Sequence, residues 1–89
     1  SVVYKIIDKF IHELEGRLEE KKITLEVTDV AENRIAQDAF DATFGARPIK
    51  RYIQSHIETM LAREIIKGTI HANSHLVIDY DNGFIAREA

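Results

Sequence analysis

One helix has both of its ends marked in this sequence. Pro48, the only proline, suits the first position of a helix, because its ring fixes φ at a helical value and its missing N–H would have no partner there. Gly68 suits the left-handed residue that closes a helix. Between them the large aliphatic residues recur at helical spacing: Ile49, Ile53, Ile57, Met60, Leu61 and Ile65. A helix over residues 48–67 must therefore pack this apolar face against the rest of the chain.

The segments before residue 40 supply elements that can cover that face. Residues 2–20 predict a helix with an apolar stripe made of Val3, Ile7, Phe10, Ile11, Leu14 and Leu18. Residues 23–28 alternate apolar and polar side chains, which is typical of a half-buried strand. Asp29 and Glu32 have the spacing of a capping box, so we expect a short helix over residues 30–39.

The C-terminal segment predicts a β-hairpin. Two apolar runs, residues 76–80 and 84–86, flank Asn82-Gly83, which is the favoured pair of a type I′ turn. The expected order of elements is α-β-α-α-β-β. This order indicates an α/β (α+β) fold, in which a small three-stranded sheet packs against helices.

The composition limits what such a chain can do. At 89 residues it makes one small domain, with little room for a deep pocket of its own. It has no cysteine, which excludes disulfides, a thiol nucleophile and Cys-based zinc sites, and is compatible with the cytoplasm. With 15 acidic against 12 basic residues, nucleic acid is a poor default partner. We expect no membrane segment, because no apolar run approaches the roughly 18 residues of a transmembrane helix.

The most unusual stretch lies at the start of the long helix. Gly45 permits tight backbone geometry, and the helix that begins at Pro48 carries partial positive charge at this end. Arg47, Lys50 and Arg51 add full positive charges. Such a corner attracts anions. The alternative interpretation is that these basic side chains face solvent and mildly oppose the helix dipole.

Other candidate motifs lack the partners that their chemistry requires. His71 and His75 have a metal-binding spacing, but the residues between them do not look helical and no third ligand is evident, so we expect no metal site. Residues 76–79 have the outline of a Walker B strand ending in Asp79. No phosphate-binding G-x-x-x-x-G-K-[ST] loop accompanies it, so Asp79 is interpreted as a solvated strand residue.

Residues 39–51, AFDATFGARPIKR, resemble the G-Y-D-P-x-Y-G-A-R-P-L-K-R signature of the Clp family of AAA+ unfoldases. Residues 53–62 are similar to the family's I-Q … I-E-N-P-L-A helix, and residues 65–68 to its closing I-L-x-G. The departures are Ala39 and Ala42 in place of Gly and Pro, phenylalanines in place of tyrosines, and Thr59-Met60 in place of Asn-Pro.

Within this family the chain looks most similar to the small C-terminal subdomain of the second AAA+ module of a ClpB-type disaggregase. The resemblance implies that residues 1–89 are one such subdomain, a fragment of a larger ATPase. This lid would not be an enzyme by itself, because the P-loop and Walker B residues would lie in the missing large subdomain. The implied partners are that large subdomain, neighbouring protomers of a hexamer and, through the full-length protein, unfolded or aggregated proteins.

The resemblance also implies the site residues. Arg47 would be the sensor-2 arginine, which reaches the β/γ-phosphates of ATP and loses one contact in ADP; the missing large subdomain would hold the Mg²⁺. Gly45 and Ala46 would let the backbone approach the nucleotide, and Pro48 would fix the helix start that aims Arg47. Ile6 and Ile7 are the candidates for covering the adenine.

Two alternatives remain open at this point. A lid of a Clp unfoldase that works with a peptidase shares much of the motif. A free-standing α/β module that binds single-stranded nucleic acid is a different class of function, but neither a GXXG clamp nor a stacked aromatic pair supports it.

Overall fold

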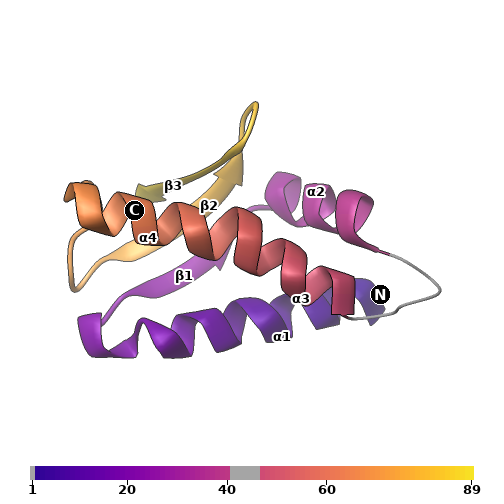
Figure 1. The fold of residues 1–89 in the computed structure, drawn as a ribbon, viewed down its shortest axis with the longest axis horizontal. Coiled ribbons are helices and arrows are strands. Elements are labelled where there is room, and N and C mark those ends of the chain that lie inside the picture. The colour runs from indigo at the N-terminus through magenta and orange to yellow at the C-terminus, as the bar shows by residue number, and fades with distance from the viewer. Residues whose placement is uncertain (1, 41–46) are drawn as a thin grey trace.

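A computed structural model of the chain describes residues 2–40 and 47–89. The elements follow in the expected order (Figure 1): α1 (Val2–Arg17), the 3₁₀ turn η1 (Glu19–Lys21), β1 (Thr24–Val27), α2 (Asp29–Ala39), α3 (Arg47–Ile53), the π-helical turn η2 (Gln54–Glu58), α4 (Thr59–Lys67), β2 (His75–Tyr80) and β3 (Phe84–Glu88). The α/β class and the α-β-α-α-β-β order are therefore confirmed.

The sheet has the order β1-β2-β3. β1 pairs with β2 in parallel, and β2 pairs with β3 antiparallel through the hairpin. Leu76 and Ile78 of β2 are fully buried, whereas the residues that alternate with them are more exposed. This period-two pattern shows that the helices cover one face of the sheet.

One core joins the sheet to the helices. Most of its aliphatic side chains come from α1, α2, the long helix and β2: Ile7, Ile11, Leu14, Ile35, Ala39, Ile49, Ile53, Ile57, Leu61, Leu76 and Ile78. Ile23 and Ile70, from the segments before β1 and β2, complete it. The stripes predicted for α1 and for the long helix are thus the packed faces. Among residues 2–40 and 47–89, no helix is long and apolar enough to cross a membrane.

The long helix is not a regular α-helix, which the sequence analysis did not predict. Ile49, Ile53, Ile57 and Leu61 are each at most 1 % exposed. At 3.6 residues per turn, their four-residue spacing would rotate the last one about 120° away from the first. The turn η2 takes up one extra residue, which removes about 100° of that rotation. The π turn therefore keeps the four side chains on one face.

Hydrogen bonds and exposure place the extra residue at the outer side of η2. The N–H and the hydroxyl of Thr59 both donate to the carbonyl of Gln54, five residues earlier. Gln54, Ser55 and His56 are exposed in succession. The core side of the turn thus stays packed, and the additional backbone bulges toward solvent.

Several element ends differ from the prediction. The first helix ends at Arg17 rather than at residue 20, because η1 tightens the chain and Lys22 adopts a left-handed conformation, with φ of 56°. The N-cap of α2 is Thr28, not Asp29: its Oγ1 accepts from the Ala31 N–H at 3.2 Å. A hydroxyl one residue earlier thus outcompetes the capping carboxylate that the spacing suggested.

The predicted C-cap of the long helix and the predicted hairpin turn are both found in the structure. Gly68 closes α4 with φ of 83°, as expected for a left-handed C-cap. The hairpin forms, and Asn82 and Gly83 both have positive φ. Because Tyr80 pairs with Phe84, its loop contains three residues rather than the two of a simple type I′ turn.

Deletion of Ser55 tests the role of the π turn. Without that residue the buried positions would follow a 4-3-4 spacing, which a regular α-helix keeps on one face. We expect the free energy of unfolding to change by less than about 1 kcal/mol, because only an exposed side chain is removed. Urea unfolding followed by circular dichroism measures this.

Deletion of the exposed Lys9 is the matched control. α1 is a regular α-helix without a π turn, so it has no extra residue to lose. The deletion therefore rotates Ile11 and Leu14 by about 100° relative to Ile7. Loss of their burial should cost more than about 2 kcal/mol. Equal destabilisation by the two deletions would contradict this account of the π turn.

Candidate functional site

The first turn of the long helix lies beside the N-terminal part of α1 at one end of the molecule (Figure 1). Arg47 is the first residue of α3 and is exposed. Pro48 lies in the first turn but is the second residue of the helix, which begins one residue earlier than predicted. Ile49 is fully buried and anchors this turn in the core. The arginine therefore projects from a rigidly packed helix start.

The other predicted site residues differ in how much of each side chain is exposed. Ile6 on α1 is half-buried and packs at the margin of the core, so part of its side chain remains accessible. Ile7 has no exposed surface and lies within the core. Gly45 and Ala46 lie outside the described residues. Arg47 and Pro48 therefore begin α3, which packs against the helix that carries Ile6.

Positive and negative side chains gather on different sides of this end of the molecule. Arg47, Lys50 and Arg51 are exposed on the first turns of α3, where they form the expected positive corner. Between α1 and α2, by contrast, Asp8 and Glu32 face each other. Burial first, and then the neighbouring Asp8 carboxylate, raise the pKa of Glu32 to about 7.

This acidic pair lines a small pocket of about 230 Å³ together with Ile11, His12, Glu15, Leu25 and Val27. A phosphate group approaching it would meet carboxylates. The positive corner at the start of α3 is therefore the side on which this end of the molecule can attract an anionic ligand.

Apolar surface lies next to the same end. Val3, Tyr4 and Ala36 line an open groove of about 460 Å³ between α1 and α2, together with Phe40, which is 52 % exposed. Val2 is 73 % exposed. The sequence analysis missed this groove. Val3 belongs to the predicted stripe of the first helix, but the groove forms only where α1 and α2 pack together.

An ion pair ties α1 to the π turn. The Arg17 guanidinium donates from Nε and from an Nη to the two carboxylate oxygens of Glu58, each at 2.9 Å. This hydrogen-bonded pair raises the pKa of Arg17. Its two-pronged geometry fixes direction as well as distance. Arg17 thus helps to hold the helix that carries Arg47 against α1.

Two aromatic side chains connect the long helix to the hairpin. The rings of Tyr52 and Phe84 meet edge to face with centroids 5.9 Å apart, and His56 lies 4.2 Å from Tyr52. The Tyr52 hydroxyl donates to Asp38 at 2.7 Å. Its pKa is raised by burial and by this hydrogen bond to a carboxylate. Tyr52 therefore joins α2, α3 and the sheet.

Asp79 is a partly exposed residue of strand β2, as predicted, but its carboxylate is bound by the protein and not only by solvent. Its carboxylate accepts from the Thr28 hydroxyl, from the Tyr80 N–H and from Arg87, each at 2.8 Å. These donors, Arg87 first, lower its pKa to about 2. Asp79 thus links β2 to β3 and to the N-cap of α2, and this role could not be foreseen because Thr28 is distant in sequence.

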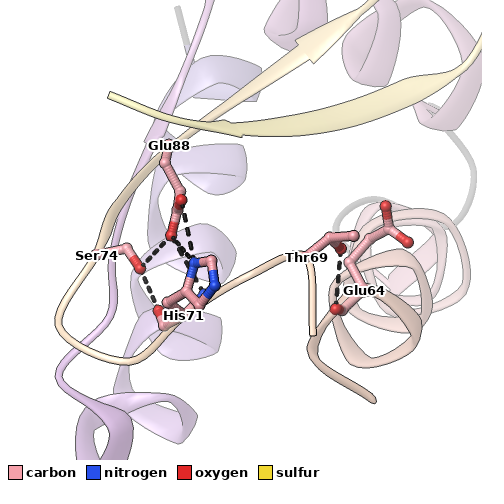
Figure 2. Close-up of polar contacts among 5 residues, drawn as sticks. All are labelled: Glu64, Thr69, His71, Ser74 and Glu88. Carbon is pink, nitrogen blue, oxygen red and sulfur yellow. Dashed lines mark hydrogen bonds and ion pairs between the residues drawn. The ribbon is translucent and has the colours of Figure 1, made fainter. Parts of the chain in front are cut away.

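The histidines give no metal centre in the part of the chain that is described. His71 lies in the loop before β2 and contacts Glu88, whereas His75 begins β2 and bonds Thr24 and Glu26 (Figure 2 shows the His71 contacts). Within residues 2–40 and 47–89, no three His, Cys, Asp or Glu side chains are placed to share a metal ion.

Comparison with known proteins decides the family. A family described as the C-terminal, D2-small domain, of ClpB protein matches residues 1–78. The chain belongs to the ClpB D2-small domain family. The Chaperone protein ClpB of Bacillus cereus is 52 % identical over 77 residues, which are 86 % of this chain and 9 % of that protein.

More distant relatives agree with this assignment. The Chaperone protein ClpB of Aquifex aeolicus is 42 % identical over 94 % of this chain and 9 % of its own length. The Negative regulator of genetic competence ClpC/MecB of Bacillus subtilis is 37 % identical over 89 % of this chain and 10 % of its own. This D2-small domain thus spans about a tenth of the proteins that it matches.

The pKa of Asp79 generates a prediction for acid stability. Because its folded pKa of about 2 lies below the ordinary value of 3.8, its stabilising contribution is present above pH 3.8 and is lost as the pH falls through 2. We expect the free energy of unfolding of Asp79→Asn to fall less steeply over this interval than that of the parent chain, and to be lower at neutral pH. Urea titrations at several pH values measure both.

Asp81→Asn, an exposed change two residues further along, is the control for loss of one carboxylate. It should keep the acid dependence of the parent chain. If Asp79→Asn also keeps it, the contacts with Thr28 and Arg87 do not stabilise the charged form of Asp79.

Proposed function

We propose that this chain is the lid subdomain of the second AAA+ module of a ClpB-type disaggregase, a ring-forming ATPase that unfolds aggregated proteins. In this proposal residues 1–89 are one subdomain of a longer chain, and the nucleotide site is completed by a large subdomain. The observation that carries it is the placement of Arg47, an exposed arginine at an anchored helix start, within a chain that belongs to the ClpB D2-small family.

The proposed role of Arg47 is to sense the nucleotide. A guanidinium can donate two hydrogen bonds to phosphate oxygens, and such charge-assisted bonds contribute about 1.5–3 kcal/mol each. The γ-phosphate is present in ATP and absent in ADP. A contact that exists in only one nucleotide state shifts the population between two lid orientations. Arg47 would thereby couple hydrolysis to movement of the lid.

The helix start supplies the rigidity that this coupling needs. Ile49 is fully buried, and Pro48 fixes φ one residue after the arginine. A change in the position of Arg47 must then move the whole lid instead of one turn. Gly45 and Ala46 belong to the proposed site as the backbone that approaches the nucleotide.

Apolar contacts to the adenine are assigned to α1. Ile6 is half-buried and can extend its accessible part toward a base, whereas Ile7 supports the same turn from within the core. The groove with Val3, Tyr4 and Phe40 offers further apolar surface. We assign it to packing against the large subdomain of the same chain, since an exposed patch of this kind marks an interaction site.

Assembly and location complete the proposal. The lid would also pack against a neighbouring protomer and help to close a hexamer, and the full-length protein would bind unfolded or aggregated proteins. A cytoplasmic location rests on the lack of cysteine. ATP and ADP would bind the shared site and not the lid alone.

A second candidate is the lid of a peptidase-associated Clp unfoldase. The similarity to ClpC/MecB favours it, but the identity of 37 % is lower than the 52 % to a ClpB. The positive corner and the acidic pocket would serve the same nucleotide chemistry in either protein. We therefore place the disaggregase first.

A chimera tests the proposed function. The D2-small domain of the Bacillus cereus ClpB is replaced by this chain, and ATP turnover and reactivation of an aggregated protein are measured. The parent chimera should be active. Arg47→Ala should lower turnover at saturating ATP about tenfold or more, because one or two charge-assisted bonds are lost from the ATP state.

Arg63→Ala is the matched control, since Arg63 is an exposed arginine on α4, the C-terminal part of the same long helix. It should retain turnover and reactivation. Arg47→Ala with the activity of Arg63→Ala would refute the sensor role, and a correctly assembled but inactive parent chimera would refute the lid assignment.

A further inference from the structure

The hairpin loop contains an exposed asparagine, Asn82, that is followed by a glycine. Asp81, Asn82 and Gly83 connect β2 to β3, and both Asp81 and Asn82 are exposed. Asn82 has φ of 56° and Gly83 has φ of 147°. Within this loop the Asp81 N–H donates to the Gly83 carbonyl at 2.9 Å. In that bond Gly83 contributes its oxygen and not its nitrogen.

Gly83 has no side chain to shield its amide nitrogen from the side chain of Asn82. A Cβ at this position would meet no heavy atom within 4 Å other than those of the two neighbouring residues, so the surroundings of the loop are open. No hydrogen bond from the Gly83 N–H is found among the described residues. We propose that Asn82 is a site of spontaneous deamidation, at which the chain is modified through a cyclic succinimide.

The reaction needs only water and base. Hydroxide removes the proton of the Gly83 amide, and the nitrogen attacks Cγ of Asn82, so that an N–Cγ bond forms. The bond from Cγ to Nδ2 breaks, and the side-chain amide leaves as ammonia. Water then opens the ring at one of its two carbonyls, which yields aspartate or isoaspartate at position 82.

The other two asparagines of the chain are held in protected settings. Asn33 lies within α2, where the next amide nitrogen belongs to the helix, and its Oδ1 accepts from the Tyr4 hydroxyl. Attack would require the middle of α2 to unwind. Arg34, the following residue, also carries a long side chain beside the reacting nitrogen.

Asn73 resembles Asn82 in conformation, with φ of 63°, but not in its surroundings. Its N–H donates to the Lys21 carbonyl at 2.9 Å. The next residue, Ser74, donates its hydroxyl to the His71 carbonyl and to Glu88, the latter at 2.9 Å (Figure 2). Glu88 also accepts from the His71 N–H at 3.2 Å. These contacts hold the segment from His71 to Ser74 and oppose the rotation that ring closure requires.

Modification at Asn82 would act on the hairpin. Both products carry a new carboxylate next to Asp81, which changes the formal charge from −3 to −4. Isoaspartate also lengthens the backbone by one methylene between Tyr80 and Phe84, whose rings pack with centroids 5.0 Å apart. Age-dependent loosening of β3 from the aromatic cluster is the expected consequence.

Parallel incubations of the chain test this proposal at mildly alkaline pH, one under native conditions and one in guanidinium chloride. Isoaspartate is mapped by peptide mass spectrometry and by a protein isoaspartyl methyltransferase. In the native sample it should accumulate at Asn82, while Asn33 and Asn73 stay intact. Denaturation should raise the rate severalfold at Asn73 and leave the rate at Asn82 unchanged. A severalfold increase at Asn82 as well would show that the fold protects it, which would overturn the proposal.

Asn82→Gly is the control variant, because glycine keeps the positive φ of the loop and removes the amide. Ammonia release and the acidic shift in isoelectric focusing should disappear under native conditions. If this variant releases ammonia at the rate of the parent chain, the modified site lies elsewhere and the proposal is wrong.

Discussion

The packing of the long helix from Arg47 to Lys67 against α1 and the sheet is the constraint on which the other features depend. Four aliphatic residues spaced by four, from Ile49 to Leu61, are all buried. A straight α-helix cannot keep them on one face, so the helix accommodates one extra residue in η2. The burial of Ile49 then fixes the turn that presents Arg47. Core packing and the placement of the charged group are thus parts of one arrangement.

Polar contacts hold the ends of this arrangement. Arg17 and Glu58 join α1 to the π turn by two hydrogen bonds, and Asp79 collects donors from Thr28 and Arg87. Both ion pairs are partly exposed, so each adds little stability by itself. Their contribution is directional: they set how the helix and the hairpin lie on the sheet. The acidic pocket at Asp8 and Glu32 leaves the basic first turns of α3 as the side of this end that can attract an anion.

Local sequence rules predicted most elements because the relevant interactions are local. Pro48 and Gly68 bound a helix through their own backbone preferences, and alternation identified β1 without knowledge of its partner. The π turn was missed because it is a compromise between helix geometry and a distant core. Thr28 was missed as a cap because a neighbouring carboxylate had a favourable spacing. The contacts of Asp79 were missed because two of its donors, Thr28 and Arg87, come from other elements of the fold.

The residues of the candidate site were predicted from a sequence motif and not from local structural preferences. The position of Arg47 followed from a motif, and the structure added that its helix start is anchored by Ile49. The same motif could not show that Ile7 is enclosed by the core while Ile6 is partly accessible, since both fall on adjacent positions of α1. The apolar groove at Phe40 arises only when α1 and α2 pack together.

The central claim is that Arg47 completes a nucleotide site which this chain does not contain. Structures of the assembled chimeric ring with a non-hydrolysable ATP analogue and with ADP test it most directly. The account predicts that the Arg47 guanidinium lies within hydrogen-bonding distance of a γ-phosphate oxygen in the first structure, and that the lid is reoriented in the second. A guanidinium directed to solvent in the ATP-analogue structure would contradict it.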